Sequence, residues 1–395
     1  MKVATDPYEH APLAGVRVLD LTRLLPGPMA TLALADLGAR VDKLEDPGPG
    51  DYLRHMPPQT GEVNGAFLAI NRDKRAGVLD LKNPSGASAL LRMVASYDVV
   101  VESFRPGVLA RLGLAHERLL EANPRLVVCA ITGYGQTGPM AQRAGHDINY
   151  LARAGLLGVT GPPGAPPALS GGQIADVAGG ALWAVSGIVA ALFARERSGK
   201  GRVLDISMTE GSMAIAGFAL ACHFTGGKVP ERGHSYLDGG LAVYRTYVTS
   251  DGGFVALGAL EPKFWSAFCA PLGIEPSMSA LLPGPHQTEW HQRLEGVFAS
   301  RTRAAWVDFA KEHDCCLEPV LAPDELLEDA QHGAREVFFE LAGQRCFRTP
   351  LGAPHTEHVT ARAAGADTAA ILTDCGFDEN DINALRAHGV LGTSD

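Results

Sequence analysis

The sequence predicts an α/β fold: a large, doubly wound domain built on a parallel sheet, with a smaller α+β domain. At 395 residues the chain exceeds the size at which a single hydrophobic core stops growing. Short β-branched runs alternate with helical patterns through the first 225 residues, as they do in successive βαβ units. The rhythm then changes. We therefore expect a large domain over 1–225, a small domain over 226–330, and a return of 331–395 to the large domain.

The first 225 residues contain the strands and helices of the predicted parallel sheet. Glycine ends the first helix at Gly38, and Asn83 followed by Pro84 begins the second. The expected strands are 15–21, 39–45, 98–103, 125–132 and 202–208, with a further strand-like run at 78–81. The expected helices are 28–37, 83–97, 118–122, 177–194 and 211–224.

A β-hairpin marks the start of the predicted small domain. Residues 244–250 and 254–260 are two strand-like runs, and Asp251-Gly252-Gly253 between them is a typical hairpin turn. The helical runs that follow, including the one expected to complete the large domain, are 263–270, 291–300, 302–314 and 379–388.

The composition excludes several classes of function. A formal net charge of −10 argues against general nucleic-acid binding, which requires a basic face. The seven cysteines contain no C-x-x-C pair, which is typical of a reduced, cytosolic protein without a zinc site. Residues 1–12 do not resemble a signal peptide. Residues 177–194 carry no formal charge and approach the length of a membrane span, but Gly179-Gly180 favours a core helix. We therefore expect a cytoplasmic protein with no membrane partner and no metal.

A titratable cluster stands out around residue 146. His146 and Asp147 lie where a glycine-containing loop meets an apolar-periodic run, and Asp176 lies one turn into the next helical run. We interpret Asp147 as the N-cap, so that the backbone N–H groups of this helix start face a developing negative charge. A base, a carboxylate and such donors can move a proton next to a carbonyl group. The alternative is structural: a hydrogen-bonded histidine, and an Asp176 that caps the core helix.

A glycine pattern and a group of basic residues each raise the question of a ligand site. Residues 133–138 spell the dinucleotide-binding pattern, but they follow a late strand and Pro139 comes directly after them. A nicotinamide or flavin site there is therefore not expected. In a doubly wound sheet, ligands bind beyond the carboxyl ends of the strands, where Arg105 falls, with Phe104 beside it to flank a purine ring. The cations that could hold a phosphorylated ligand, or form a solvated basic face, are Arg72, Lys74, Arg75, Lys82, Arg105 and Arg111.

Taken together, these strings resemble those of the family III CoA transferases, the CaiB/BaiF group, over nearly the whole chain. The strings that carry the resemblance are residues 24–28, 71–75, 102–107, 133–139, 145–150, 198–201, 237–240 and 258–264, together with Asp176. The chain is most similar to the racemase-like members, because they combine a Gly-His-Asp-Ile-Asn-Tyr string with a Glu in a Gly-Ala-x-Glu-Pro string. His146 and Glu261 match these two positions.

The resemblance implies a Rossmann-like large domain and an interlocked homodimer whose active site is shared between subunits. It implies proton transfer at the carbon α to a thioester, interconverting (2R)- and (2S)-2-methylacyl-CoA. His146, oriented by Glu261, would serve one face and Asp176 the other, with the backbone N–H of Asp147 as enolate donor. The alternative is a CoA transferase in which Asp176 forms an acyl-enzyme. A non-catalytic acyl-CoA-binding protein is a third interpretation.

The same resemblance implies where the CoA portion of the substrate binds, and no other cofactor is expected. In addition to the cations above, the residues expected at this site are Leu24, Leu79, Asp80, Ser103, Phe104, Gly145, Asn149 and Tyr150. One departure concerns Asp46, because related racemases place an arginine there to bind CoA. The phosphate contacts are therefore expected to shift to Lys74, Arg75 or Arg105.

Overall fold

The computed structural model describes residues 11–57, 59–60, 63–226, 231–354 and 356–392. The chain divides into two compact units. The large unit comprises Met1–Ala154, Gly172–Ile215 and Ala330–Asp395, and the small unit comprises Gly155–Gly171 and Ala216–Asp329. The chain thus enters the small unit at Ala216, whereas the sequence placed the boundary at 225–226, and it returns at Ala330. Residues 155–171, assigned to the large domain by sequence, belong to the small unit.

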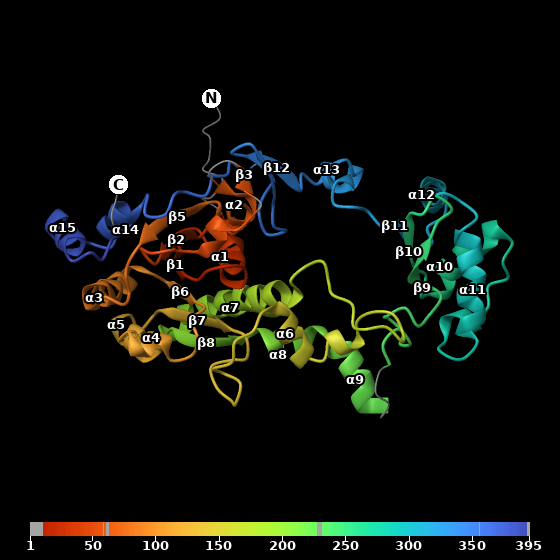
Figure 1. Cartoon of the computed structure of the whole chain (residues 1–395), viewed down its shortest axis with the longest axis horizontal. Helices are drawn as coiled ribbons and strands as arrows, with labels where there is room; N and C mark the ends of the chain where they lie inside the picture. The colour runs from red at the N-terminus through yellow and green to blue at the C-terminus, as the bar shows by residue number, and fades with distance from the viewer. Residues whose placement is uncertain (1–10, 58, 61–62, 227–230, 355, 393–395) are drawn as a thin grey trace. The chain divides into compact units, whose positions relative to one another are not determined.

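A six-stranded parallel sheet forms the centre of the large unit, as predicted (Figure 1). Its strands are β1 (Arg17–Leu21), β2 (Arg40–Glu45), β5 (Lys74–Val78), β6 (Val99–Glu102), β7 (Val127–Thr132) and β8 (Arg202–Ser207). Their order is β5-β2-β1-β6-β7-β8, and every neighbouring pair is parallel. The chain therefore runs outward in both directions from β1 and β6. This arrangement creates a topological switch point between these two strands, where doubly wound sheets bind their ligands.

The large unit also contains helices, several of which pack against this sheet. They are α1 (Pro26–Asp36), α2 (Gly65–Asn71), α3 (Pro84–Met93), α4 (Val108–Arg111), α5 (His116–Ala122), α6 (Asp147–Arg153), α7 (Leu182–Ser198), α8 (Met208–Ile215), α13 (Ala330–Ala334), α14 (Thr368–Asp374) and α15 (Glu379–Ala387). Leu90 of α3, Leu119 of α5, Ile371 of α14 and Leu385 of α15 share one buried apolar cluster with Val100 of β6. Segments from both ends of the chain therefore build one core, and α14 packs against β5 (Figure 1).

A π-helix, Ala175–Ala181, leads directly into α7. It lies against α8 at backbone distance: a Cβ added to Gly211 would approach the carbonyl oxygen of Gly179 to 1.9 Å. Glycine is therefore required at Gly211 by the close approach of the two helices. The continuous helix Ala175–Ser198 is, among the described residues, the one with the length and composition of a membrane span, and 44% of its most apolar window is buried. One side of α7 packs against β7, β8 and α1, as expected for a core helix, while the other side is exposed.

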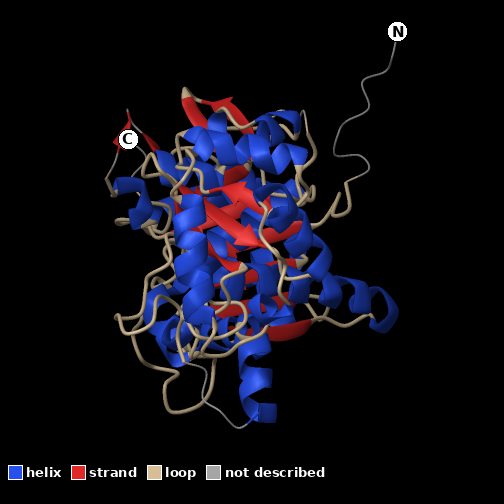
Figure 2. Cartoon of the chain, turned by 90° about the vertical axis from the view of Figure 1, so that its right-hand side faces the viewer, coloured by secondary structure: helices blue, strands red, loops and turns tan. Residues whose placement is uncertain are grey.

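The small unit contains an antiparallel sheet of three strands, and Figure 2 distinguishes its strands and helices by colour. The strands are β9 (Tyr244–Val248), β10 (Phe254–Gly258) and β11 (Leu317–Pro319), in the order β11-β10-β9. The helices are α9 (Gly217–Gly226), α10 (Pro262–Cys269), α11 (Gln287–Phe298) and α12 (Arg303–Glu312). Buried aromatic rings of Trp265, Phe268, Phe298 and Trp306 form the centre of its own core. The predicted β9–β10 hairpin is confirmed.

The structure corrects several predicted elements. The strand expected at 78–81 is β5, at Lys74–Val78. Its first two residues, Lys74 and Arg75, are charged, so the sequence did not indicate a buried strand there. Both side chains are paired with buried carboxylates, which allows them to lie in the sheet. The helix expected over 211–224 is two helices, α8 and α9, separated at Ala216. Elements not predicted are α2, α4, α13, α14, β11, the hairpin of β12 (Phe338–Leu341) and β13 (Gln344–Phe347), and the pair β3 (Gln59–Thr60) and β4 (Val63–Asn64).

Candidate active site

A cavity of about 920 Å³ lies at the carboxyl edge of the parallel sheet. Its wall follows the ends of four strands: Leu21 of β1, Glu45 of β2, Ile131 and Thr132 of β7, and Ser103 directly after β6. All of its lining residues belong to the large unit. Volumes of this order are typical of sites that enclose a small-molecule ligand. The cavity therefore occupies the position that the switch point between β1 and β6 predicts.

His146 and Asp176 both line this cavity, and Asp147 links them. The prediction that Asp147 is the N-cap of α6 is wrong by one residue: His146 holds the cap position in an extended conformation, and Asp147 is the first helical residue. The backbone N–H of His146 donates to Asn149 Oδ1 at 3.0 Å, which fixes the start of the helix. Asp147 Oδ1 accepts a hydrogen bond at 3.0 Å from the backbone N–H of Asp176.

Asp176 is a carboxyl group with an unusual proton affinity. Burial and the neighbouring Asp147 carboxylate raise the pKa of Asp176 from 3.8 to about 7. No described residue forms an ion pair or a side-chain hydrogen bond with this carboxyl group. It lies in the first turn of the π-helix, which does not support the interpretation of Asp176 as an N-cap. π-Helical turns within helices are frequent at functional sites. A carboxyl group held near neutrality can both accept and donate a proton at physiological pH.

The Tyr150 ring requires glycine at two positions. Its ring is buried beside the cavity, and its hydroxyl donates to the carbonyl oxygen of Gly145. A Cβ at Gly133 would lie 2.2 Å from this ring, and one at Gly145 would lie 2.7 Å from it. The first glycine of the 133–138 pattern is therefore needed to admit Tyr150, which differs from the role that the dinucleotide pattern would suggest. The Tyr134 ring meets Tyr150 edge to face, with centroids 5.2 Å apart.

Among the described residues, four lysine or arginine side chains line the cavity. Arg105 and Lys82 were expected there, and Lys82 Nζ is paired with Asp46 at 2.9 Å. Arg23 and Arg143 were missed. Arg23 lies two residues after the end of β1, so the rule that selected Arg105 could also have found it. Arg143 lies in the loop between β7 and α6, and no sequence pattern indicated its position.

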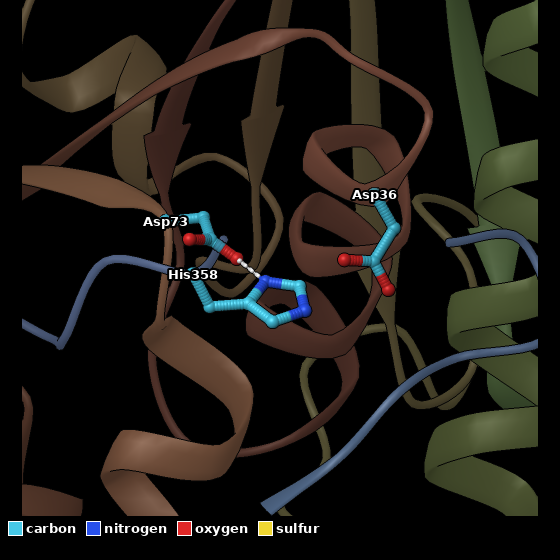
Figure 3. A group of neighbouring side chains, drawn as sticks. All are labelled: Asp36, Asp73 and His358. Carbon is cyan, nitrogen blue, oxygen red and sulfur yellow. Dashed lines mark hydrogen bonds and ion pairs between the residues drawn. The ribbon is translucent and has the colours of Figure 1, made fainter. Parts of the chain in front are cut away.

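Arg72 does not reach the cavity, and the prediction that it binds CoA is revised. Its guanidinium is buried, and Nη1 donates to Asp36 at 2.7 Å and contacts His358 Nδ1 at 3.1 Å, with Asp73 as a further partner. Asp36, Asp73 and His358 form the one group of side chains, among the described residues, with the spacing of metal ligands (Figure 3). Because the guanidinium already lies among these three side chains, we interpret the group as an ion-pair network.

Lys74 and Arg75 are likewise structural, which corrects the expectation that they bind phosphate. Lys74 is buried and donates to Asp20 Oδ2 at 3.2 Å and to the carbonyl oxygen of Pro28 at 2.9 Å. Burial lowers the pKa of Lys74 to about 8. Arg75 pairs with Asp42 at 2.6 Å and with Asp374 at 2.8 Å. None of these cations lines the cavity.

The remaining expected contacts divide in the same way. Leu24, Leu79, Ser103, Phe104, Gly145, Asn149 and Tyr150 line the cavity. The other two, Asp80 and Arg111, are absent from its wall. The Asp80 carboxylate instead accepts a hydrogen bond at 2.9 Å from the backbone N–H of Lys82.

Asp51 is a site residue that the sequence did not identify. Leu24 adopts a left-handed backbone conformation with φ of 65°, which is costly for a branched side chain. Its N–H donates to both carboxylate oxygens of Asp51 at 3.2 Å, and Lys43 Nζ lies 3.1 Å from the same carboxylate. This buried pair holds the loop after β1 in place at the cavity.

Glu261 belongs to the small unit. It is exposed and holds the N-cap position of α10, where its carbonyl oxygen accepts from the N–H groups of Phe264 and Trp265. Its carboxylate makes no cap hydrogen bond.

Comparisons with known proteins identify the family of this chain. The model of CoA-transferase family III matches residues 13–366. The α-methylacyl-CoA racemase of Mus musculus is 37% identical over 96% of this chain and 97% of its own length. The acetyl-CoA:oxalate CoA-transferase of Acetobacter aceti is 35% identical over 87% of this chain and 89% of its own. A CaiB/BaiF family protein from Brucella suis has the same fold, with a TM-score of 0.79 and 28% identity over 92% of this chain and 99% of that one. The chain belongs to CoA-transferase family III.

Proposed function

We propose that this protein is an acyl-CoA racemase that interconverts (2R)- and (2S)-2-methylacyl-CoA thioesters by 1,1-proton transfer. The observation that carries the proposal is Asp176, whose pKa of about 7 suits a general acid and base at neutral pH. His146 lines the same cavity and supplies the second base that inversion requires. The similarity to the mouse protein named α-methylacyl-CoA racemase supports this reaction.

The chemistry follows from these two groups. One of them takes the proton from the α-carbon, and the electron pair of the broken C–H bond moves onto the thioester carbonyl oxygen as an enolate. The other group returns a proton to the opposite face of the same carbon. The first N–H groups of α6 have no carbonyl partner within the helix, so that of Asp147 is available to the enolate oxygen.

The CoA portion would bind along the mouth of the cavity. Arg23, Arg105 and Arg143 are exposed there and can pair with phosphate oxygens. Lys82 is shared with Asp46 and would contribute less. Phe104 lines the same wall and offers an aromatic face to the purine ring.

A CoA transferase is the second candidate, because relatives at 35% identity are named as transferases. In that reaction Asp176 would attack the thioester as a carboxylate and form an anhydride with loss of the CoA thiolate. A pKa of about 7 leaves part of the Asp176 population protonated at neutral pH, which is unfavourable for a nucleophile and suits proton transfer. On this argument we place the racemase first.

We also propose a homodimer in which Glu261 of the partner subunit orients His146. The exposed side of α7 carries large apolar side chains, which a second subunit would cover: Leu182, Trp183, Val189 and Phe193. All seven cysteines are free, in keeping with a reducing compartment, for which we propose the cytoplasm.

Incubation with (2R)-2-methylacyl-CoA in D₂O, without an acceptor acid, tests the reaction. A racemase incorporates one deuterium at the α-carbon as chirality is lost, and His146→Gln should slow this strongly. The absence of exchange, with CoA passing to an added carboxylate and an adduct trapped at Asp176, would replace the racemase with the transferase.

A further inference from the structure

A second, smaller cavity of about 100 Å³ lies beside the loop that follows β6. Its lining includes Glu102, Arg105, His116, Glu117 and Gln136. Arg105 lines both this cavity and the large one, so the loop contacts both. None of the roles proposed above uses His116 or Glu102.

Glu102 is the buried last residue of β6, and its two carboxylate oxygens have different partners. Oε2 accepts a hydrogen bond at 2.8 Å from the backbone N–H of Phe104. Oε1 lies 3.0 Å from Nε2 of His116, the first residue of α5. The carboxylate therefore connects the imidazole of one helix to the backbone of the loop.

This loop carries part of the proposed CoA site. Residues 103–106 all line the large cavity. Within the described residues, the Arg105 guanidinium forms no hydrogen bond or ion pair with another side chain, so the course of the backbone decides where it lies. The Glu102–Phe104 hydrogen bond is the contact that turns the chain directly after the strand.

We propose that His116 is a positioning residue for ligand binding: its imidazolium holds Glu102, and through Glu102 it holds loop 103–106 in the conformation that receives CoA. Affinity for CoA would then decline as His116 loses its proton. The inference rests on the proposed binding of CoA at this cavity, and it holds for a racemase and a transferase alike.

The electrostatic surroundings support this direction. The hydrogen bond to Glu102 raises the pKa of His116 above its usual 6.5, and Glu117 and Asp205 act in the same sense, while partial burial opposes them. Arg105 is the cation that lines the small cavity together with His116. Because the pKa is raised, the charged pair is complete below pH 6.5 and is lost as the pH rises through the raised value. A neutral imidazole can still donate, but the bond is then no longer charge-assisted.

Titration calorimetry of CoA itself tests the proposal, since no turnover is needed. The background would be Asp176→Asn, so that this cavity carboxyl no longer titrates. In it, His116→Gln keeps a side-chain N–H for Glu102 but cannot change charge. His388→Gln, at the exposed C-terminal cap of α15, serves as the matched histidine control. Titration of the CoA phosphates affects all three proteins equally.

From pH 5.5 to pH 8.5, the affinity for CoA should fall in the parent, which keeps His116, about fivefold more than it falls in His116→Gln. The His388→Gln protein should follow its parent. In the Asp176-containing enzyme, His116→Gln should alter the pH dependence of KM and leave kcat unchanged.

Identical pH profiles for the parent and His116→Gln would overturn the inference. So would a uniform loss of affinity at every pH with a lowered Tm, because that result indicates a purely structural residue. If neither protein binds CoA at any pH, the proposed function fails as well. Binding with identical pH profiles would overturn only the role of His116, so the two failures are distinguishable.

Discussion

Asp147→Asn isolates the electrostatic part of the Asp176 environment. The amide oxygen can still accept the hydrogen bond that Asp147 Oδ1 receives from the Asp176 N–H at 3.0 Å, so the helix start is preserved and only the charge is removed. Two causes raise the pKa of Asp176 from 3.8 to about 7, and burial is the larger. Removing the smaller cause should lower the pKa by about 1, which is about 1.4 kcal/mol in the protonation equilibrium.

The measurement is the pH dependence of α-proton exchange, as kcat/KM, between pH 5 and 9. The limb that reports Asp176 should move about one pH unit toward acid in Asp147→Asn and disappear in Asp176→Asn. A direct check is the ¹³C chemical shift of the labelled Asp176 carboxyl group across the same range. An unchanged limb, or one displaced toward alkali, would refute the account of this site.

Three further predictions follow from the burial and contacts of single residues. Asp176→Asn should stabilise the protein by about 2–4 kcal/mol at pH 8 and by much less at pH 5. A buried carboxyl with a raised pKa disfavours the fold once the pH exceeds 3.8, up to the raised value, and paired thermal unfolding curves would show the difference. Arg105→Gln should raise KM about tenfold with an unchanged Tm. Arg72→Ala should instead cost about 3–5 kcal/mol of stability, because it leaves buried carboxylates unpaired. A lowered Tm for Arg105→Gln together with a raised KM alone for Arg72→Ala would contradict the assignment of Arg105 to the ligand and of Arg72 to an ion pair. Gly133→Ala should cost about 1–3 kcal/mol and perturb binding, since its Cβ meets a tyrosine ring, while Gly171→Ala, in open space, should stay within about 0.5 kcal/mol in the same denaturation assay.

Much of the fold could be predicted from local patterns. Runs of β-branched residues in alternation with helical segments led to the parallel sheet, and the glycine turn led to the β9–β10 hairpin. Errors arose where a local signal was ambiguous. The strand β5 begins with two charged residues, and only their buried partners Asp20 and Asp42 make a strand possible there. The two short helices α8 and α9 carried the pattern of one.

The candidate site shows the same division. The rule tied to strand ends placed Arg105 and its neighbour Phe104 at the cavity, the family resemblance placed Ser103 there, and the structure has all three in the wall. The same reasoning failed for Arg72, Lys74 and Arg75, because a cation near a strand looks alike in sequence whether it faces solvent or a carboxylate. Asp51 and Arg143 gave no signal, since their positions depend on loops that return from elsewhere in the chain.

The sequence by itself determined the class of fold, the family, and the residue types able to move a proton next to a carbonyl group. These properties reside in short-range periodicity and in strings of adjacent residues. Only the tertiary structure decided which cations are free to meet a ligand and which are consumed in ion pairs. It also decided that Asp176 titrates near neutrality, because proton affinity depends on burial and on a carboxylate 29 residues away in the chain.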